Sequence, residues 1–418
     1  MKSFYITTPI YYINSSPHIG HSYTSIACDI LARYNKLLGN DVYFLSGTDE
    51  HGQKVEQAAN NQSLKPQDFA DKMSVQFKDL ISFLNCETND FIRTTETRHK
   101  KAAQALWNKL LDNNQIYLSN YEGWYSIRDE AFYSENELIK KDGKFIAPSG
   151  AEVEWIKEES YFFKLSEWQD RLIDFYNNNP KSILPESRFN EVLSFIKSGL
   201  KDLSVSRTTF KWGVPVPNNP KHVMYVWIDA LCNYLTSIGY PDENSANFKN
   251  YWPALHIVGK DILRFHSVYW PAFLMAAGLK PPSRVFAHGW WTNEGEKISK
   301  SLGNVIDPYE IVSKYGLDQI RFFLFREVPF GNDGDFSKEA IAQRLNADLS
   351  NNYGNLVQRI CSFVKKNCDS KIFNNFDNNE DDNILLKSSI KRLNNYKEYM
   401  GNQEIDKALK EVFLLLNE

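Results

Sequence analysis

The residues of this chain best suited to chemistry are two imidazoles near its start, His18 and His21. An apolar run that favours a β-strand, residues 3–10, precedes them, and the apolar residues that follow recur at helical spacing as far as Leu37. Both histidines therefore fall at a predicted helix N-terminus, where unsatisfied backbone N–H groups and the helix dipole favour a bound phosphate. Alone, they are equally compatible with an ordinary polar helix start.

The ends of this predicted helix carry the expected signals. Ser16 is expected to cap it, Pro17 suits its first turn, and Gly39 suits its end. Residues 42–46 read as a second strand, so the chain begins with strand, helix and strand. Gly20, between the histidines, allows another group to approach the backbone closely.

A basic loop much later in the chain is the second group with chemical potential. Lys297 and Lys300 lie on either side of Ser299, between Gly295 and Gly303. Lysines with serine hydroxyls between them suit a polyanion such as a triphosphate, and the flanking glycines favour a segment that moves. A solvated charged loop would show the same pattern.

Polar residues also follow the predicted strands. Asp49 lies in a glycine-flanked turn, residues 46–52, at the carboxyl end of the second strand, where open parallel sheets bind ligands. It would serve equally well as the cap of the next helix. Strands predicted at residues 223–228 and 255–258 would bring more side chains to the same edge as His18, namely Trp227, Asp229, Asp261 and His266.

Composition excludes several classes of protein. Apolar residues make up 42% of the chain, which supports a sizeable core and argues against global disorder. With a net charge of −4, a nucleic-acid partner would be held by local basic patches. The five cysteines form no Cys-x-x-Cys pair, which indicates a reducing, cytoplasmic location. No apolar run is long enough for a membrane span, and the first strand begins too near Met1 for a targeting peptide.

Changes in sequence texture divide the chain into five predicted parts. The ranges are 1–115 for the first half of an α/β domain, 116–187 for a β-rich insertion with many aromatics, 188–280 for the second half, 281–344 for a linking segment with the basic loop, and 345–418 for a helical part. The last predicted helix reaches Leu416 without a visible cap, so the chain is expected to be truncated there.

His18-Ile19-Gly20-His21 followed by Lys297-Ile298-Ser299-Lys300-Ser301 resembles the paired signatures of class I aminoacyl-tRNA synthetases. Further stretches resemble the bacterial methionyl-tRNA synthetases within that class, over essentially the whole chain. These stretches are residues 8–14, 47–52, 225–230, 259–262, 265–267 and 270–271. Agreement at so many separated places favours the functional interpretation of each motif.

The resemblance implies an α/β fold: a Rossmann-like parallel-sheet catalytic domain with a small β-rich insertion, followed by an α-helical anticodon-binding domain. By resemblance, the ATP site would comprise His18, Gly20, His21, Gly259, Asp261, Lys297 and Lys300. The methionine site would comprise Ile10, Tyr12, Asp49, Trp227, Ala230, Leu231, Tyr234, Ile262, His266 and Trp270. Asp49 would hold the α-ammonium group, and the apolar, aromatic remainder suits a polarizable thioether.

Three further residues take roles from the resemblance. Arg207 matches an arginine implicated in activation, so the expected catalytic residues are Arg207, both histidines and both lysines. Asn355 and Arg359, one helical turn apart, would contact the anticodon.

The sequence differs from the family in three places. Ile298 replaces the methionine that is usual in the lysine loop, and Leu231 stands where some relatives carry proline. Many relatives bind zinc in the insertion through Cys-x-x-Cys pairs, but Ser126, Asp129 and residues 146–149 occupy those places here. No structural zinc is therefore expected, and no metal ligand is assigned.

The expected reaction has two steps. Methionine attacks the α-phosphorus of ATP–Mg²⁺ to give methionyl-adenylate, and the 3′-terminal adenosine of tRNA(Met) then takes the methionyl group. The enzyme is expected to be monomeric. A class I synthetase for another amino acid would need a larger editing insertion or thiolates for an active-site zinc. A nucleotidyltransferase would have no use for the helical part, and an inactive tRNA-binding relative would have no reason to keep Asp49 and the signature residues.

Overall fold

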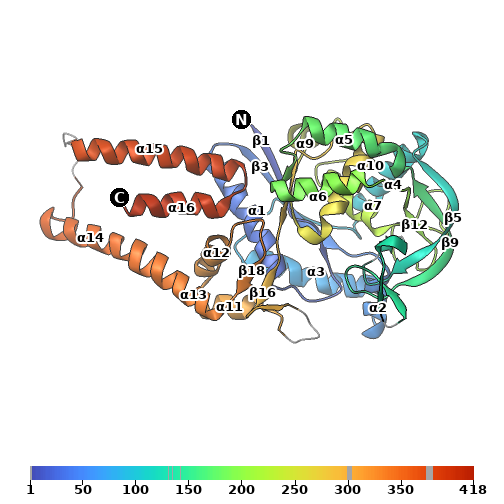
Figure 1. The fold of residues 1–418 in the computed structure, drawn as a ribbon, viewed down its shortest axis with the longest axis horizontal. Helices are drawn as coiled ribbons and strands as arrows, with labels where there is room; N and C mark the ends of the chain where they lie inside the picture. The colour runs from blue at the N-terminus through green and yellow to red at the C-terminus, as the bar shows by residue number, and fades with distance from the viewer. Residues whose placement is uncertain (1, 130, 134, 142, 299–303, 373–379) are drawn as a thin grey trace. The chain divides into compact units, whose positions relative to one another are not determined.

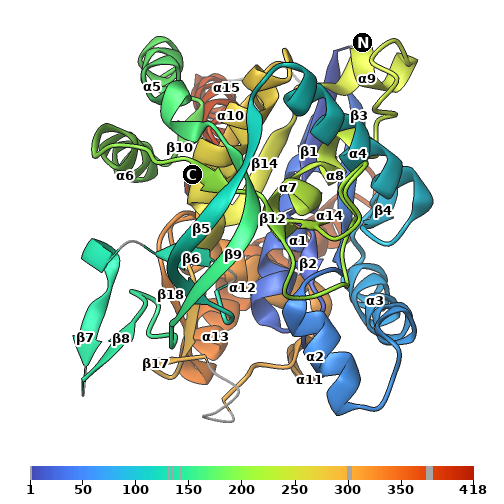
Figure 2. The same cartoon turned by 90° about the vertical axis from the view of Figure 1, so that its right-hand side faces the viewer.

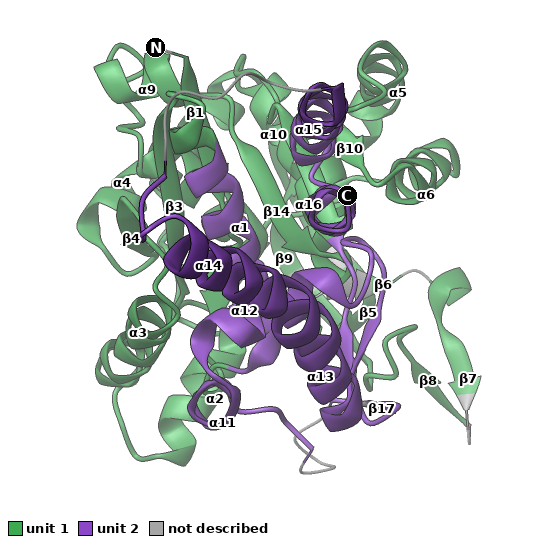
Figure 3. Cartoon of the chain, turned by 90° about the vertical axis from the view of Figure 1, so that its left-hand side faces the viewer, with its two compact units in different colours: residues 1–17, 35–287 green, residues 18–34, 288–418 purple. Residues whose placement is uncertain are grey.

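A computed structural model describes residues 2–129, 131–133, 135–141, 143–298, 304–372 and 380–418. Its contacts divide the chain into two compact units (Figure 3). The first comprises residues 1–17 and 35–287, and the second comprises residues 18–34 and 288–418. The start of the helix that carries the two histidines thus belongs to the same unit as the C-terminal part of the chain.

The first unit is built on a sheet that contains seven strands among the described residues, several of them visible in Figure 2. Its order is β10–β15–β14–β1–β3–β2, and β4 also pairs with β3. The strands are β1 (Ser3–Thr7), β2 (Tyr11–Tyr12), β3 (Asp41–Asp49), β4 (Asp90–Arg93), β10 (Ile183–Leu184), β14 (Leu255–Gly259) and β15 (Arg284–His288). β3 runs parallel to β1, β2 and β4, and β1 runs parallel to β14. The predicted fold class, a parallel-sheet Rossmann-like core, is confirmed.

Helices connect these strands because parallel neighbours need long crossover connections. In the N-terminal part they are α1 (Ile19–Leu37), α2 (Gln53–Asn61), α3 (Pro66–Phe83) and α4 (Thr97–Asp112). Later in the unit they are α5 (Gln169–Asn178), α6 (Glu186–Lys197), α7 (Val226–Leu231), α8 (Asn233–Thr236), α9 (Ala246–Tyr251) and α10 (Trp270–Ala276). A π-helical turn, Phe265–Tyr269, leads directly into α10.

The β-rich insertion packs on the same apolar core as the sheet. β5 (Ile116–Ser126) pairs antiparallel with β9 (Glu154–Phe163), side by side in Figure 2. Phe163 of β9 meets Phe273 of α10 edge to face, with 4.8 Å between ring centroids. Shorter strands complete the insertion and its base: β6 (Ala131–Tyr133), β7 (Ile139–Lys141), β8 (Lys144–Ile146), β11 (Leu203–Ser204), β12 (Ser206–Arg207) and β13 (Val223–Met224).

The second unit combines the first part of α1 with a small sheet and a run of helices. The sheet has the order β17–β16–β18, formed by Glu296–Lys297, Trp291–Asn293 and Gly334–Phe336. The helices are α11 (Pro308–Tyr315), α12 (Leu317–Arg326), α13 (Lys338–Arg344), α14 (Asn355–Asn367), α15 (Glu380–Gly401) and α16 (Ile405–Leu416), and a π-helical stretch, Leu345–Gly354, precedes α14. α15 and α16 lie side by side (Figure 1). No helix among the described residues is long and apolar enough to cross a membrane.

Three local predictions are wrong. The strand predicted at residues 223–228 ends at Met224, and Val226–Leu231 is helix α7. α1 begins at Ile19, so His18 rather than Ser16 occupies the capping position. Residues 63–111 show helical spacing of apolar residues, which predicts helix throughout, yet residues 90–93 form a strand, β4, that pairs with β3. Short apolar runs fit either structure, and tertiary pairing decided these cases.

β3 and β4 approach each other too closely for a side chain at Gly47. An added Cβ atom would lie 2.1 Å from the carbonyl oxygen of Ile92, which is a backbone atom and cannot move aside cheaply. Gly401 in α15 is a matched control, since a Cβ atom there would meet nothing within 4 Å.

We expect Gly47→Ala to lower the free energy of unfolding by roughly 1–3 kcal/mol or more, as overpacking does. Gly401→Ala should be neutral or stabilising because alanine favours a helix. Urea denaturation of both variants is the measurement. Equal stability of the two variants would contradict the close strand approach.

Candidate active site

The two histidines of the N-terminal motif cap the helix that they begin. The backbone N–H of Gly20 donates to Nδ1 of His18 over 3.1 Å. In return, the backbone N–H of His18 donates to Nδ1 of His21 over 3.0 Å. This reciprocal pattern is a capping box with imidazole nitrogens in place of the usual hydroxyl and carboxylate oxygens. The two rings thus satisfy N–H groups that the helix start would otherwise leave without partners.

These hydrogen bonds determine where the rings carry their protons. A nitrogen that accepts an N–H hydrogen bond carries no proton, so neutral His18 and His21 each hold their proton on Nε2. The ring centroids lie 3.9 Å apart. The first turn of α1 therefore holds two Nε2–H donors close together, an arrangement suited to an anion such as phosphate.

Gly20 is required for this arrangement. A Cβ atom at this position would lie 3.0 Å from Cε1 and 3.1 Å from Nδ1 of His18. A contact this tight would displace the imidazole from its capping position. The group that approaches the backbone of Gly20 is thus the His18 ring itself.

The lysine loop is anchored on the same helix end. The carbonyl oxygen of Ile306, just after the loop, accepts from the backbone N–H of Ile19 over 3.2 Å. Before the loop, Nε2 of His288 lies 2.8 Å from the hydroxyl of Thr24 in α1. The structure therefore brings both ends of the lysine segment to the helix that carries the histidines, although some 270 residues separate them in the sequence.

Aromatic packing supports this junction. The ring of Tyr23, buried in α1, stacks on Phe325 with 4.9 Å between centroids and meets Trp291 and His288 edge-on. The backbone of Lys297 lies in β17, paired with Thr292. The Lys297 side chain and the whole of Lys300 lie outside the described residues.

In the first unit, three residues of the expected methionine pocket are joined by hydrogen bonds. The carbonyl oxygen of Ile262 can only accept, so Nδ1 of His266, 2.9 Å away, carries the proton. Nε2 of His266 then accepts from the hydroxyl of Tyr234 over 2.7 Å. Burial lowers the pKa of His266 to about 4, outweighing the backbone hydrogen bond and the charge of Asp261, so its ring is neutral at pH 7.

Aromatic rings surround this polar group. Trp227 stacks flat on Phe265, with 3.8 Å between centroids, and meets His266 edge-on. Trp270 is fully buried beside Tyr234. One apolar cluster includes or contacts these and other expected pocket residues: Ile10, Tyr12, Trp227, Leu231, Tyr234, Ile262 and Trp270. Ala230 of α7 is also buried. An apolar slot with one neutral polar end is the chemistry that a thioether side chain needs.

Asp49 lies at the last position of β3, paired in register with Tyr12 of β2, and it is 7% exposed. The alternative interpretation of Asp49 as a helix cap is wrong. Gly52 occupies the capping position of α2, and no side chain caps that helix.

A buried carboxylate that the sequence analysis gave no role lies next to the pocket residues. Asp229 of α7 is within 2.7 Å of both His51 Nδ1 and His99 Nε2, and all three side chains are buried. Burial alone would raise the pKa of Asp229, but the two histidines outweigh it and hold that pKa well below its usual range. Asp229 therefore ties α7 to the end of β3 and to α4. A lone histidine in a sequence gives no signal of such a long-range pairing.

Arg207 is buried inside the first unit. Its Nη1 donates to the hydroxyl of Ser204 over 2.9 Å and to the carbonyl of Ser206 over 2.6 Å. The guanidinium lies over the rings of Tyr225 and Tyr125, at 4.5 and 5.4 Å from their centroids. Arg207 thus links the insertion strand β5 to the segment before α7.

The remaining predicted residues lie at surfaces. Gly259 ends β14, and Asp261 follows in an exposed 3₁₀ turn, Lys260–Ile262. Asn355 and Arg359 are exposed on α14, and the four-residue spacing places them on one face of it. The predicted single turn between them is therefore confirmed, and their roles stay a prediction.

Asp129 lies in the part of the insertion where the sequence has Ser126, Asp129 and residues 146–149 instead of cysteine ligands. It is hydrogen-bonded to several neighbours there. The carboxylate of Asp129 accepts from the hydroxyls of Tyr133, over 2.9 Å, and of Ser149. Its backbone N–H donates to Ser126 Oγ over 3.2 Å, and Arg128 donates to the carbonyl of Ser149 over 2.6 Å. Among the described residues, no group of three or more His, Cys, Asp and Glu is arranged to hold a metal ion.

We expect Asp129→Ala to loosen the insertion because the hydroxyls of Tyr133 and Ser149 lose their acceptor, and protease cleavage within residues 126–149 should become faster. A chelator should leave the melting temperature of the parent protein unchanged, and metal analysis should find no stoichiometric zinc. Lys144→Ala is the control, since its ion pair with Glu152 is highly exposed. Stoichiometric zinc in the purified protein would contradict this account.

Comparison with known proteins places these features in a family. The family model described as tRNA synthetases class I (M) matches residues 4–361. A methionine–tRNA ligase of Rickettsia conorii is 61% identical over 372 residues, covering 89% of this chain and 72% of that protein. The corresponding ligase of Rickettsia bellii is 56% identical, covering 100% of this chain and 82% of that protein.

A solved structure agrees with the sequence relatives. Mycobacterium tuberculosis methionyl-tRNA synthetase in complex with methionyl-adenylate superposes with a TM-score of 0.97 at 49% identity, over 100% of this chain and 82% of that one. At such identity over the whole chain, the likeness extends beyond the fold. The chain belongs to the methionyl-tRNA synthetases of class I, as the signature motifs predicted.

Proposed function

We propose that this methionine–tRNA ligase activates methionine with ATP and transfers it to tRNA(Met) through the residues described above. The observation that carries the assignment of residues is the reciprocal capping of α1 through Nδ1, which assigns the protons of neutral His18 and His21 to Nε2 at the helix N-terminus. Membership of the family supports the overall reaction. The similar M. tuberculosis synthetase was solved in complex with methionyl-adenylate, which supports the same compound as the intermediate here.

In the first step, the methionine carboxylate attacks the α-phosphorus of ATP and pyrophosphate leaves. His18 and His21 donate hydrogen bonds to phosphate oxygens, whose charge shifts in the transition state. Lys297 and Lys300 bind the β- and γ-phosphates, and Gly259 and Asp261 contact the nucleotide. Mg²⁺ bound to the ATP phosphates would neutralise part of their charge.

Methionine is recognised at both of its ends. Asp49 binds the α-ammonium group at the end of β3. The side chain of methionine lies among Trp227, Trp270 and neighbouring apolar residues. The hydroxyl of Tyr234 donates its proton to His266, so its oxygen contacts the methionine sulfur. Arg207, buried by Tyr125 and Tyr225, keeps the insertion and the pocket in register rather than touching phosphate. That places it as a positioning residue for activation.

In the second step, a ribose hydroxyl of the tRNA takes the methionyl group from the adenylate. Asn355 and Arg359, exposed on one face of α14, contact anticodon bases or their phosphates. We further propose that the protein acts as a monomer in the cytoplasm, where tRNA is charged. Pyrophosphate exchange tested with each of the twenty amino acids checks the proposal, and only methionine should support it.

The capping geometry gives a sharp test of His21. Both His21→Ala and His21→Asn remove the Nε2–H donor, so methionine activation should slow by roughly 10²–10³-fold in each, as for one preorganised donor. The amide oxygen of asparagine can replace Nδ1 as the helix cap, so only His21→Ala should lose about 1 kcal/mol of stability. Pyrophosphate exchange, methionine affinity and thermal melting are measured on both. Restored activation in His21→Asn would mean that His21 acts only as a cap.

A variant at the expected anticodon contact should affect the transfer to tRNA without affecting the activation of methionine. Arg359→Ala should leave pyrophosphate exchange unchanged and slow the charging of tRNA(Met), because Arg359 is assigned to the anticodon alone. Lys366→Ala, further along the same helix, is the control for a general loss of positive charge. Equal charging by the two variants would rule out the anticodon assignment of Arg359.

A further inference from the structure

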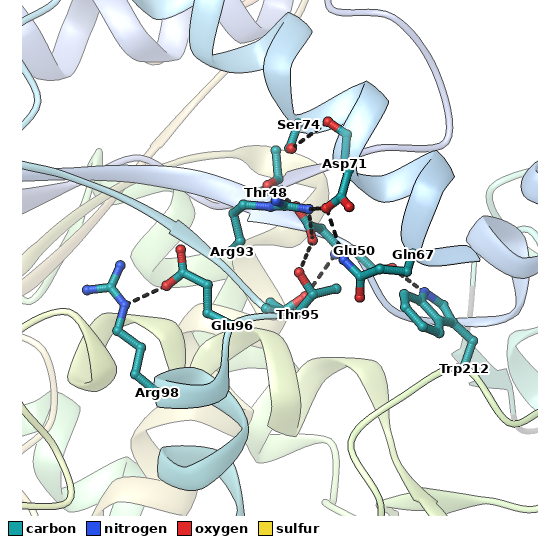
Figure 4. A network of polar contacts seen from close by, with 11 residues as sticks. Thr48, Glu50, Gln67, Asp71, Ser74, Arg93, Thr95, Glu96, Arg98 and Trp212 are labelled. Carbon is teal, nitrogen blue, oxygen red and sulfur yellow. Dashed lines mark hydrogen bonds and ion pairs between the residues drawn. The ribbon is translucent and has the colours of Figure 1, made fainter. Parts of the chain in front are cut away.

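The residue after Asp49 has a carboxylate that is fully buried and fully hydrogen-bonded. Glu50 Oε1 accepts from the hydroxyl of Thr48 over 2.7 Å and from Nε of Arg93 over 2.7 Å. Glu50 Oε2 accepts from Nη2 of Arg93 over 3.0 Å and from the hydroxyl of Thr95 over 2.5 Å. Figure 4 shows these side chains converging on Glu50. We call these four residues the Glu50 network.

The Glu50 network is rigid for an energetic reason. An ionised carboxylate has about four acceptor positions, and four donors meet this one. A buried charge is tolerated only when it is paired and hydrogen-bonded in this way. Burial by itself would lower the pKa of Arg93, but Glu50 and Asp71 outweigh it and raise that pKa, so Arg93 keeps its positive charge.

Beside the Glu50 network, further hydrogen bonds fix the backbone on the C-terminal side of Asp49. The peptide that joins Asp49 to Glu50 is held twice: its carbonyl accepts from the N–H of Ile13 over 3.3 Å, and its N–H donates to the hydroxyl of Thr94 over 3.0 Å. The next carbonyl, that of Glu50, accepts from the indole N–H of Trp212 over 2.5 Å.

The side chains alternate around Asp49. Thr48 and Glu50 lie on the same side of the extended chain, as their mutual hydrogen bond shows, so Asp49 projects to the opposite side. The side of the strand on which the Asp49 carboxylate lies is therefore set by the backbone conformation that its neighbours Thr48 and Glu50 share.

We propose that Glu50, held by Arg93, is a positioning residue that orients Asp49 toward the α-ammonium group of the amino-acid substrate. The inference rests on the proposed role of Asp49. A carboxylate that the fold already holds in its binding orientation loses little conformational entropy when the ligand binds, so less of the binding free energy is spent on ordering it. Disturbing the network should therefore weaken the ammonium contact while sparing ATP and the thioether slot.

The test compares two ligands, methionine and 4-(methylthio)butanoate, which lacks the ammonium group. Glu50→Gln and Arg93→Lys should each weaken methionine binding about tenfold, or about 1.4 kcal/mol. Binding of ATP and of the ligand without the ammonium group should not change. Arg98→Lys is the matched control, because Arg98 follows the same strand but pairs with Asp90 and Glu96 instead (Figure 4). It should bind both ligands as the parent does.

A double-mutant cycle separates the positioning role from a purely structural one. In an Asp49→Asn background, adding Glu50→Gln should cost no further methionine affinity. Equal weakening for both ligands, or additive losses in the cycle, would overturn the inference and leave the proposed function standing. If Asp49→Asn alone left methionine binding unchanged, the proposed role of Asp49 would fail, and the inference with it.

Loss of a buried charge partner can unfold a protein, so a milder variant is included. Thr95→Val keeps the shape and removes one of the four donors. It should show the same selective loss of methionine affinity, smaller in size, at a melting temperature close to that of the parent. Unchanged methionine affinity in Thr95→Val, together with a nonselective loss in Arg93→Lys, would also overturn the inference.

Discussion

The backbone at the carboxyl end of β3 must hold one fixed position, because several elements of the first unit make their contacts there. β3 lies between β1 and β4, and Gly47 allows the backbone of Ile92 to come close. Parallel sheets collect ligand-binding residues at this end because crossover connections leave loops there. Asp49, Glu50 and His51 follow one another at that point, and each is oriented by a different part of the fold.

Two buried carboxylates, those of Glu50 and Asp229, hold the end of β3 against the neighbouring elements. Glu50 ties the strand end to β4, and Asp229 ties it to α7 and α4 through His51 and His99. In a medium of low dielectric constant an unpaired carboxylate would be very costly, so each can occupy only the position where its partners meet. Elements distant in the sequence are thereby brought into one register around the expected amino-acid site.

The ligand proposed for the second unit is an anion, and an anion sets a different requirement. There two imidazoles cap α1 through Nδ1, so each neutral ring carries its proton on Nε2. The lysine segment is anchored at both ends on the same helix through Ile306 and His288. Neutral donors at a helix N-terminus can stabilise phosphate oxygens without burying a charge, and lysine side chains can add positive charge.

The sequence by itself determined the signature motifs, the alternation of strands and helices and the helical C-terminal part, because periodicity and glycine placement are local properties of the chain. The parallel-sheet fold followed from the family that those motifs resemble. The sequence also indicated that the insertion lacks zinc ligands, which remains a prediction, as do the five domain ranges and the residue roles. Only the tertiary structure decided that His18 and His21 both cap the start of α1, that β4 exists and that Glu50, His51 and Asp229 are buried beside the expected site. Those features depend on partners tens to hundreds of residues away or on exact ring geometry, and a buried carboxylate pattern leaves no periodic signal in a sequence.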